Sequence, residues 1–300
     1  MTDMPHWPDL EAAIAAATGE PLGATRRVAL SGGCIHRAYR ISDHGGRHYF
    51  VKLNRGDGAA MFAAEMAGLR ELEQAHGPRV PRPLATGVAG GVAFLALAYL
   101  DLSPGDDRSA ARLGAELARL HHRTRRRFGW DRDNTIGATP QSNACCDEWT
   151  EFWRTRRLAP QFAWAEQRAG GAFPRTRCDR LLDSIGDFFA GYEPVASLVH
   201  GDLWCGNQAC DAHGHPVIFD PAVYFGDRET DIAMSELFGG FPERFYAAYD
   251  DAWPLDPGYR VRRRLYNLYH VLNHYNLFGG GYLAQARSMI DALLAECGRA

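Results

Sequence analysis

The sequence predicts an α+β chain in two lobes, a small antiparallel β-rich lobe over 1–102 and a larger, mostly α-helical lobe over 103–300. Short strand-like segments separated by glycine-containing turns crowd the first lobe, whereas long amphipathic segments fill most of the second. A chain of 300 residues is long enough to give each lobe a core of its own. The segment DLSPGDD, at 101–107, is the expected hinge between them.

The first lobe is expected to begin with an alanine-rich helix over 9–17. Strands follow at 25–30, 36–42 and 47–54, and SGGCI and DHGG supply the glycines that tight reversals need. A helix over 59–75 places apolar side chains at helical spacing on one face, namely Phe62, Met66, Leu69 and Leu72. The proline-rich stretch PRVPRPLATG breaks that pattern, and VAFLALAYL at 92–100 reads as a buried strand.

The second lobe is expected to be helical, except for one region. Amphipathic patterns predict helices over 107–122, 147–168, 177–192, 258–278 and 282–297. Between 197 and 220 the period changes, because short apolar runs alternate there with polar turns. This region is therefore expected to form strands and the loops that join them.

Composition excludes several classes of protein. A net charge of −3 gives no overall attraction to nucleic acid or to an anionic membrane, and the one basic cluster, 121–132, reads as a solvated helix end. No apolar run is long enough to cross a bilayer, and the N-terminus lacks the features of a secretory signal. Seven cysteines without framework spacing indicate reduced thiols. We expect a cytoplasmic protein without a nucleic-acid or membrane partner.

Lys52, in FVKLNR, is the only lysine among 33 lysine and arginine residues. It lies in the middle of a predicted strand, and Glu65 lies at the edge of the buried stripe of the following helix. A carboxylate there could hold the ammonium group against nucleotide phosphates. The alternative is a strand lysine that extends to solvent.

The segment HGDLWCGN, at 200–207, lies between two apolar strands and carries Asp202 and Asn207. Asp220 ends the next strand. Carboxylate and carboxamide oxygens suit Mg²⁺, which keeps further positions for phosphate oxygens, and Asp202 could accept the proton of a hydroxyl group. The alternative is that Asp202 and Asn207 only cap turns.

A zinc site is the less favoured interpretation of the same region. It would draw on five side chains between the end of one strand and the next turn, namely His200, Cys205, Cys210, His213 and His215. Their spacing does not match a CxxC arrangement, and DAHGHP resembles a turn between strands.

Together, these segments resemble the protein-kinase-like superfamily, in which SGGCI would be a loose form of the glycine-rich loop. HGD in place of HRD, and the lack of DFG and APE, point away from protein kinases. The chain further resembles the fructosamine kinase (ketosamine-3-kinase) family almost end to end, through SGGCIHRAYRI, FVKLN, FAAEMAGL, FLALAYLDL, NTIGATPQSN, EWTEFWRTRRLAPQ, LVHGDLWCGN, IFDPAVYFGDRETDIAM and LYHVLNHYNLFGGGYLAQA.

The resemblance implies a bilobal protein-kinase-like fold that uses ATP and Mg²⁺. It makes Asp202 the catalytic base, and Asn207 and Asp220 the metal ligands. The implied ATP-binding residues are Gly32, Gly33, Cys34, Lys52, Glu65, Leu97, Ala98 and Tyr99, of which the last three would meet adenine through backbone groups. The family usually has Glu at the position of Ala98 and Ser at that of Cys205. Neither departure removes a catalytic group.

Members of this family phosphorylate the sugar of a ketosamine, which labilises the adduct and repairs glycated amines. Trp204 could stack on the sugar, and His270, Asn273 and His274 could line the acceptor pocket, although all four could equally be packing residues. Cys34 could be no more than a small loop residue, but the resemblance favours a redox role for it. We therefore expect a monomer or a homodimer linked by a disulfide through Cys34. Two alternatives are a kinase with an aminoglycoside- or choline-type acceptor and a non-catalytic nucleotide-binding pseudokinase.

Overall fold

The computed structural model describes residues 5–30 and 36–297, which fold into two compact units. One unit spans Met1–Gly105 and Ala209–Asp220, and the other spans Asp106–Gln208 and Pro221–Ala300. The main boundary thus falls slightly after the expected one at 102/103. The segment 209–220 also joins the first unit, although it lies far along the chain. An antiparallel β-rich unit and a mostly helical unit confirm the expected α+β class.

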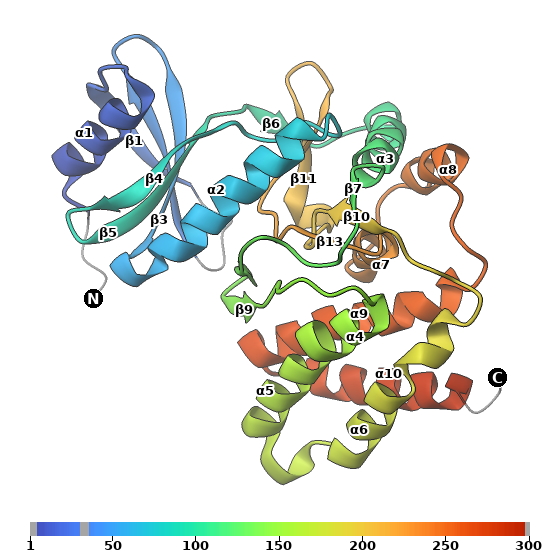
Figure 1. Ribbon diagram of the computed structural model, residues 1–300. Coiled ribbons are helices and arrows are strands. Elements are labelled where there is room, and N and C mark those ends of the chain that lie inside the picture. Colours follow the sequence, from blue (N-terminus) through green and yellow to red (C-terminus); the bar gives the residue numbers. More distant parts are fainter. Residues whose placement is uncertain (1–4, 31–35, 298–300) are drawn as a thin grey trace. The chain divides into compact units, whose positions relative to one another are not determined.

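The first unit is built on a five-stranded antiparallel sheet of order β1-β2-β3-β5-β4 (Figure 1). Its strands are β1 (Ala24–Leu30), β2 (Arg37–Asp43), β3 (His48–Arg55), β4 (Pro83–Ala89) and β5 (Val92–Ala98). Four of them match the predicted segments. The fifth, β4, was not predicted because its prolines read as a break. It is an edge strand, where a missing N–H is tolerated.

Two helices cover opposite faces of this sheet. On β3, Tyr49, Val51 and Leu53 are buried in the core that also receives α1 (Trp7–Thr18). Side chains alternate between the two faces of a strand, so Lys52 points to the other face. That face meets α2 (Ala59–Gln74), whose Glu65 reaches Lys52.

A hairpin anchors residues 209–220 to the first unit. Its strands β11 (Gln208–Asp211) and β12 (Pro216–Ile218) form a small sheet of order β12-β11-β6 with β6 (Leu102–Ser103). Arg79, which follows α2, forms a parallel bridge with Val217 and an ion pair with Asp211 at 2.5 Å. The hairpin therefore ends at Asp220 as an extension of the first unit.

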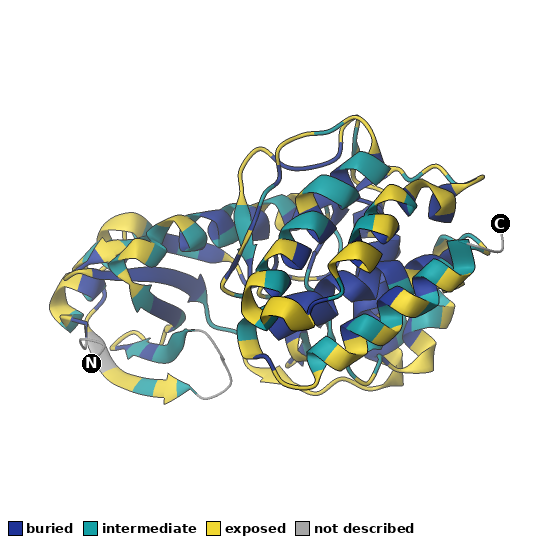
Figure 2. Ribbon diagram, turned by 90° about the horizontal axis from the view of Figure 1, so that it is seen from below, coloured by how far each residue is buried: buried dark blue, intermediate teal, exposed yellow. Residues whose placement is uncertain are grey.

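The second unit is mainly helical. Its helices are α3 (Asp107–His121), α4 (Trp149–Phe152), α5 (Ala159–Ala169), α6 (Arg175–Asp183), α7 (Glu229–Leu237), α8 (Glu243–Ala252), α9 (Tyr259–Phe278) and α10 (Tyr282–Cys297). Its strands are β7 (Thr124–Arg125), β8 (Asn134–Ile136), β9 (Thr139–Gln141), β10 (Ala196–Val199) and β13 (Tyr224–Gly226). Figure 2 shows the buried interior of this unit in dark blue, to which α9 contributes twelve buried residues.

Three details differ from the predicted helices. The helix expected over 147–168 contains a π-helical segment, Trp153–Leu158, between α4 and α5. The helix expected over 177–192 is α6 followed by a 3₁₀ segment at Ile185–Phe189. Helices α7 and α8 were not predicted, since both are short and glycine and proline residues separate them.

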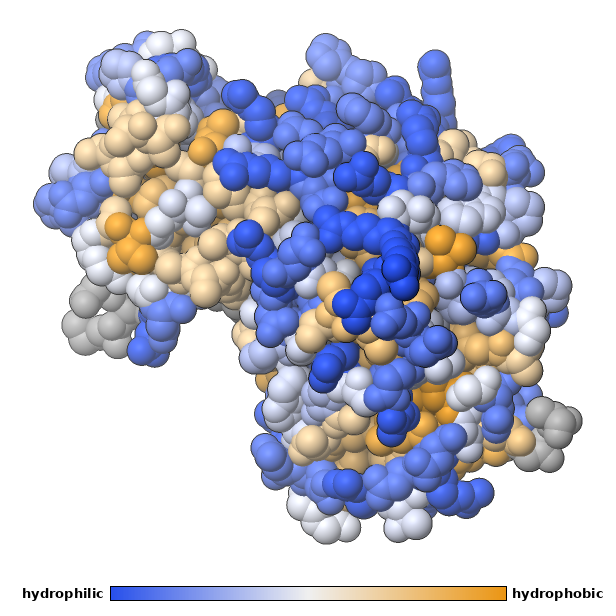
Figure 3. All heavy atoms as spheres, viewed as in Figure 1, coloured by the Kyte–Doolittle hydropathy of each residue, from blue (hydrophilic) through white to orange (hydrophobic). Residues whose placement is uncertain are grey.

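In the view of Figure 3, pale orange surface covers part of the first unit, and the second unit is mainly blue. Four large apolar side chains are well exposed among the described residues: Val88, Leu102, Val195 and Phe278. Within 5–30 and 36–297, no helix combines the length and apolar character that a membrane span requires.

Candidate active site

Lys52 is the centre of a charged cluster in the first unit. Its side chain is only 6% exposed, and its Nζ lies 2.6 Å from Glu65 Oε1 and 2.7 Å from Asp220 Oδ1. The predicted contact between Lys52 and Glu65 is therefore present. The second contact was not predicted, because Asp220 was expected only as a metal ligand. One ammonium thus holds two carboxylates that are far apart in sequence.

The charges of this cluster stabilise one another. Burial alone would lower the pKa of Lys52, but the carboxylates of Asp220 and Glu65 outweigh it and raise that pKa. Burial raises the pKa of Glu65, and Lys52 opposes the rise. The cluster contains two carboxylates for one ammonium, so it can accept further positive charge.

Asp220 has a backbone conformation that few residues adopt. Its φ is 58°, in the left-handed region, where Asp and Asn are tolerated better than other non-glycine residues. Its side chain is 47% exposed although Lys52 holds one of its oxygens. A strained turn that presents a half-exposed carboxylate is typical of a functional site.

In the second unit, HGDLWCGN forms a compact loop after the buried strand β10. Asn207 Nδ2 donates to the backbone oxygen of Asp202 at 2.8 Å and to its carboxylate at 3.2 Å. Because the amide nitrogen is turned towards Asp202, the Oδ1 of Asn207 is the atom suited to ligate a cation. Gly201 has a φ of 81°, and a Cβ there would lie 2.2 Å from the carbonyl oxygen of Ala222, so only glycine fits.

A buried carboxylate braces this loop. Asp231, in α7, accepts the backbone N–H of His200 at 2.6 Å and that of Gly201 at 2.8 Å. Its Oδ2 also lies 3.2 Å from Nε2 of His121, whose Nδ1 lies 2.7 Å from the hydroxyl of Tyr249. The brace thus joins α3, α7 and α8 to the residues just before Asp202.

Burial acts on the pKa values of both side chains of the brace. Burial lowers the pKa of His121, which therefore stays neutral and can donate from Nε2. Burial would raise the pKa of Asp231, but the hydrogen bond from His121 and those from the loop lower it overall. Asp231 thus remains a charged acceptor for the loop amides. Sequence reasoning missed both roles, although GDRETDIAM contains Asp231 and the paired histidines at the end of α3 include His121.

Aromatic side chains line the surface next to the loop. Trp204 packs edge-on against Phe238 with ring centroids 5.9 Å apart, and Phe238 lies 4.6 Å from His274. His274 in turn lies 5.3 Å from Tyr282. The structure thus brings Trp204 and His274 into one aromatic row.

The other two candidates for the acceptor pocket are buried within the second unit. His270 and Asn273 are each 3% exposed, and Asn273 accepts a hydrogen bond from Gln161. Burial and the neighbouring His274 lower the pKa of His270 to about 3. These contacts fit the packing interpretation that the sequence left open.

Two backbone N–H groups of the segment expected to meet adenine already donate hydrogen bonds within the first unit. The N–H of Ala98 donates to the carbonyl of Arg82 at 2.9 Å, and the N–H of Tyr99 donates to that of His48 at 3.2 Å. Leu97 pairs with Phe50 and Pro83. Adenine contacts at this segment would therefore fall to its carbonyl groups or to the N–H of Leu100.

The predicted phosphate-covering turn, with Gly32, Gly33 and Cys34, lies outside the described residues. His36, the first described residue after it, packs edge-on against Phe62 with ring centroids 5.1 Å apart. Burial, and then the charge of Lys52, lower the pKa of His36 to about 4. A neutral imidazole thus stands beside the charged cluster.

The described residues contain no group of three or more His, Cys, Asp and Glu side chains that could hold a metal ion. The predicted ligands Asn207 and Asp220 offer a carboxamide and a carboxylate, and oxygen donors of these kinds suit Mg²⁺, which completes its shell with water and phosphate. Asn207 belongs to the second unit and Asp220 to the first.

The sequence profile of the fructosamine kinase family matches residues 6–296. A probable ketoamine kinase of Synechocystis sp. is 45% identical over 289 residues, which is 96% of this chain and 97% of that protein. A chloroplastic protein-ribulosamine 3-kinase of Arabidopsis thaliana is 39% identical over 279 residues, covering 92% of this chain and 85% of that protein.

Solved structures agree with these relatives. A Haemophilus somnus protein provisionally named fructosamine-3-kinase superposes with a TM-score of 0.87 at 28% identity, covering 96% of this chain and 97% of that one. The aminoglycoside phosphotransferase APH(4)-Ia superposes with a TM-score of 0.60 at 18% identity, covering 95% of this chain and 98% of that one. The second likeness concerns the fold alone, and it agrees with the expected protein-kinase-like architecture.

Proposed function

The chain belongs to the fructosamine kinase family, and on that premise we propose that it transfers the γ-phosphate of ATP to a sugar hydroxyl of a ketosamine. The observation that carries the proposal is the family match, which extends over residues 6–296. Phosphorylation of the sugar prepares the adduct for loss from the amine, so the activity is a deglycation. The protein-bound ribulosamines named for the Arabidopsis thaliana relative and free ketosamines are both candidate substrates.

We assign the base to Asp202. Its carboxylate would take the proton of the acceptor hydroxyl while that oxygen bonds to the γ-phosphorus, the bond from the γ-phosphorus to the β,γ-bridging oxygen breaks, and ADP leaves. The hydrogen bonds from Asn207 fix the orientation of Asp202, and Asp231 fixes the backbone before it. Such transfer depends on positioning and on neutralised charge more than on covalent chemistry.

We assign Lys52 to the α- and β-phosphates, with Glu65 holding its ammonium group in place. Asn207 and Asp220 would supply oxygen ligands to Mg²⁺, which would neutralise phosphate charge when bound. The contact of Asp220 with Lys52 occupies only one carboxylate oxygen, Oδ1. The other oxygen is the one suited to the cation.

The aromatic row of Trp204, Phe238 and His274 supports a sugar acceptor. Aromatic faces suit the apolar face of a sugar ring, and the row begins two residues after Asp202. We propose that the acceptor lies against Trp204 and His274. The disulfide-linked dimer through Cys34 stays a prediction, which non-reducing gels and activity with and without reductant would test.

The experiment is a kinase assay by mass spectrometry. The protein is incubated with Mg-ATP and a panel of fructosyl-amines, ribulosyl-amines, a glycated protein, an aminoglycoside and choline. We expect a phosphate mass increment on a ketosamine only. An increment on the aminoglycoside or choline alone, or no transfer to any acceptor, would contradict the proposal.

The Asp202→Asn variant tests the base. We expect its turnover to fall on the order of 10²–10⁴-fold, because the proton acceptor is lost, while nucleotide binding is largely kept. Isothermal titration with ADP and Mg²⁺ provides the control for an intact nucleotide site. Turnover equal to that of the unchanged protein would refute the assignment.

A further inference from the structure

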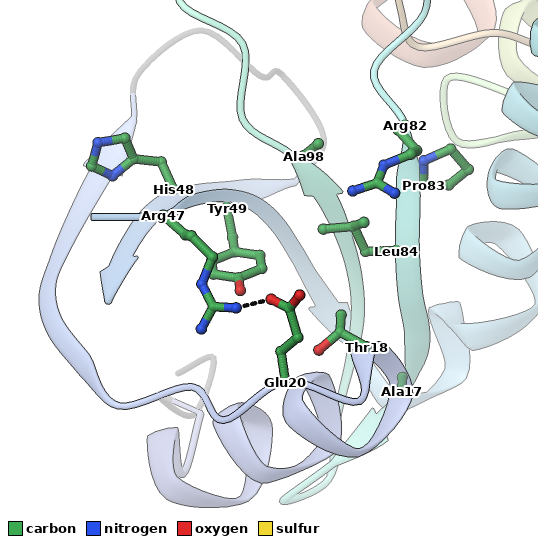
Figure 4. A pocket seen from close by; sticks show the side chains of 10 residues that line it. All are labelled: Ala17, Thr18, Glu20, Arg47, His48, Tyr49, Arg82, Pro83, Leu84 and Ala98. Carbon is green, nitrogen blue, oxygen red and sulfur yellow. Dashed lines mark ion pairs between the residues drawn. The ribbon is translucent and has the colours of Figure 1, made fainter. Parts of the chain in front are cut away.

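A cavity of about 490 Å³ opens in the first unit on the face of the sheet that carries α1. Figure 4 shows ten residues around it, which come from α1 and the turn after it, from β3 and β4 with the residue before each, and from the end of β5. Tyr49 lines it and belongs to the face of β3 opposite to Lys52. The cavity is thus separate from the charged cluster, and its size is within the range of small-ligand sites.

The two arginines that line the cavity differ in their partners. Arg47 is fully engaged, since it bonds Asp43 at 2.6 Å and the carbonyl of Pro21 at 2.9 Å and also pairs with Glu20. Arg82 is exposed, and its guanidinium has no hydrogen bond or ion pair with the described residues. Five N–H donors of a permanent cation therefore remain for a ligand. The backbone of Arg82 is held in place, because its carbonyl accepts the N–H of Ala98.

The other polar groups of the cavity suit hydroxyl groups. The ring of Tyr49 is buried, and within the described chain its hydroxyl has no hydrogen-bond partner. The side chain of Glu20 is 55% exposed although it pairs with Arg47, so its carboxylate can accept further hydrogen bonds. Thr18 donates its hydroxyl hydrogen to the carbonyl of Ile14, which leaves its oxygen as an acceptor. In Figure 4, Tyr49, Glu20 and Thr18 extend into the same space.

The remaining wall is apolar and small. Leu84 and Pro83 come from the start of β4, and Ala17 comes from the last turn of α1. These side chains would contact the carbon skeleton of a compact ligand. The cavity thus presents one unpaired cation, several hydroxyl-binding groups and a short apolar wall.

We propose that this cavity binds a small polyhydroxy anion, either a sugar monophosphate or a sugar acid. The planar guanidinium of Arg82 would hold the phosphate or carboxylate through two parallel hydrogen bonds. Tyr49, Glu20 and Thr18 would bind the hydroxyl groups. The proposal goes beyond the kinase reaction and does not depend on it, since Arg82, Tyr49, Glu20 and Thr18 have no role in that reaction. Ala98, which is expected to meet adenine through its backbone, also lines the cavity.

The test is isothermal titration of the full chain with ribose 5-phosphate, gluconate, ribose and inorganic phosphate. We expect one site for ribose 5-phosphate or gluconate, and much weaker binding of ribose, which has no anionic group, and of inorganic phosphate, which has no hydroxyl-bearing skeleton. The two anions distinguish a phosphate from a carboxylate ligand. No binding of either anion at millimolar concentration overturns the proposal.

Variants locate the site. Arg82→Gln should weaken binding about tenfold or more, because a charge-assisted pair is lost. Leu84→Trp should also weaken it by filling the cavity. The matched control is Arg55→Gln, another exposed arginine of the same unit, and it should bind like the unchanged protein.

Asp202→Asn and an excess of ADP with Mg²⁺ should leave the affinity unchanged, which separates the cavity from the proposed kinase site. Equal affinity in Arg82→Gln, or displacement of the anion by ADP, overturns the proposal. A failure of the kinase assay would leave these binding results unaffected, so the two proposals fail independently.

Discussion

At the scale of the residue, the lone lysine is explained by the space between two carboxylates. Lys52 Nζ lies within 2.7 Å of Glu65 and of Asp220, and its side chain is only 6% exposed. A compact ammonium can donate to both at once, whereas a guanidinium is planar and larger. Substitution by arginine would keep the positive charge but displace the two carboxylates. Its effect would therefore report on the shape of the side chain and not on its charge.

We therefore expect Lys52→Arg to lower kcat/KM for ATP about 10- to 100-fold while the protein still folds. Lys52→Met should in addition destabilise the fold by about 3–5 kcal/mol, because Glu65 is left buried without its partner. Steady-state kinetics and urea unfolding measure the two effects. The control is Arg55→Lys, at the exposed end of β3. Full activity of Lys52→Arg would make the lone lysine an accident of composition.

Two histidines with lowered pKa values make the fold sensitive to acid. Burial and His274 lower the pKa of His270 to about 3, and burial and Lys52 lower that of His36 to about 4. Both are neutral in the fold, whereas in the unfolded chain they gain protons near pH 6.5. The unfolded state thus binds more protons below that pH, so stability is lost as pH falls from 6.5 towards 4 and below.

We expect the free energy of unfolding to fall by up to about 1.4 kcal/mol per pH unit for each such histidine across this window. His270→Gln should reduce the slope of the unfolding free energy against pH, measured between pH 6.5 and 5, by the contribution of one histidine. His213→Gln, at an exposed position, is the control for the substitution itself. An equal slope in His270→Gln would contradict the assignment of a buried neutral imidazole.

Neighbouring side chains of the candidate site could be predicted from the sequence better than the contacts that support them. Lys52 with Glu65, and Asp202 with Asn207, could be found because each residue type suits one role at that spacing. The contact between Lys52 and Asp220 joins residues far apart in the chain, so no local pattern indicates it. Asp231 was missed for the same reason, because its partners are the backbone amides of another segment.

At the scale of the element, most strands and long helices could be predicted from the periodicity of their apolar residues. The exceptions have physical causes. Strand β4 contains Pro83 and lies at the edge of its sheet, where a proline costs little. Helix α7 is buried through most of its length, so it lacks the polar face that marks an amphipathic helix. The π-helical turn at Trp153–Leu158 has no sequence signal that differs from that of an α-helix.

The loop after β10 leaves no room for a side chain at Gly201. Gly201→Ala would place a Cβ 2.2 Å from the carbonyl oxygen of Ala222, in a left-handed conformation. We expect a loss of about 2–5 kcal/mol in stability together with most of the activity, because backbone cannot yield and the clash displaces Asp202. Gly191→Ala is the matched control, since Gly191 has a φ of 77° and open space around it.

Gly191→Ala should cost only the conformational strain, about 1–2 kcal/mol, and leave turnover unchanged. Urea unfolding and kcat measured on both variants separate the two contributions. Equal loss of stability in the two variants, with turnover kept in Gly201→Ala, would show that close approach to Ala222 does not constrain the loop.

At the scale of the whole molecule, the two units are not two consecutive pieces of chain. The chain leaves the second unit after Gln208, forms the hairpin of β11 and β12 in the first unit, and returns after Asp220. A division at one hinge could be predicted from composition, because the strand-rich and helix-rich regions differ there. The return of 209–220 could not, since it depends on pairing with β6 and on Arg79.

This insertion connects Asp220 to a distant ion pair through the hairpin. Asp211 starts the turn of the hairpin, where it accepts the backbone N–H of His213 and of His215 and pairs with Arg79. Burial would raise the pKa of Asp211, but these hydrogen bonds lower it to about 2, so the carboxylate stays charged at neutral pH. Its loss would loosen the hairpin that ends at Asp220.

We expect Asp211→Ala to raise KM for ATP several-fold and to leave the overall fold intact, although Asp211 is assigned no contact with the nucleotide. Hydrogen exchange should quicken in the hairpin, because its turn loses two hydrogen bonds and an ion pair. The control is His213→Ala, which keeps the backbone N–H that Asp211 accepts. If exchange quickens in the hairpin while KM for ATP stays constant, Asp220 is held by Lys52 alone, and the hairpin does not position it.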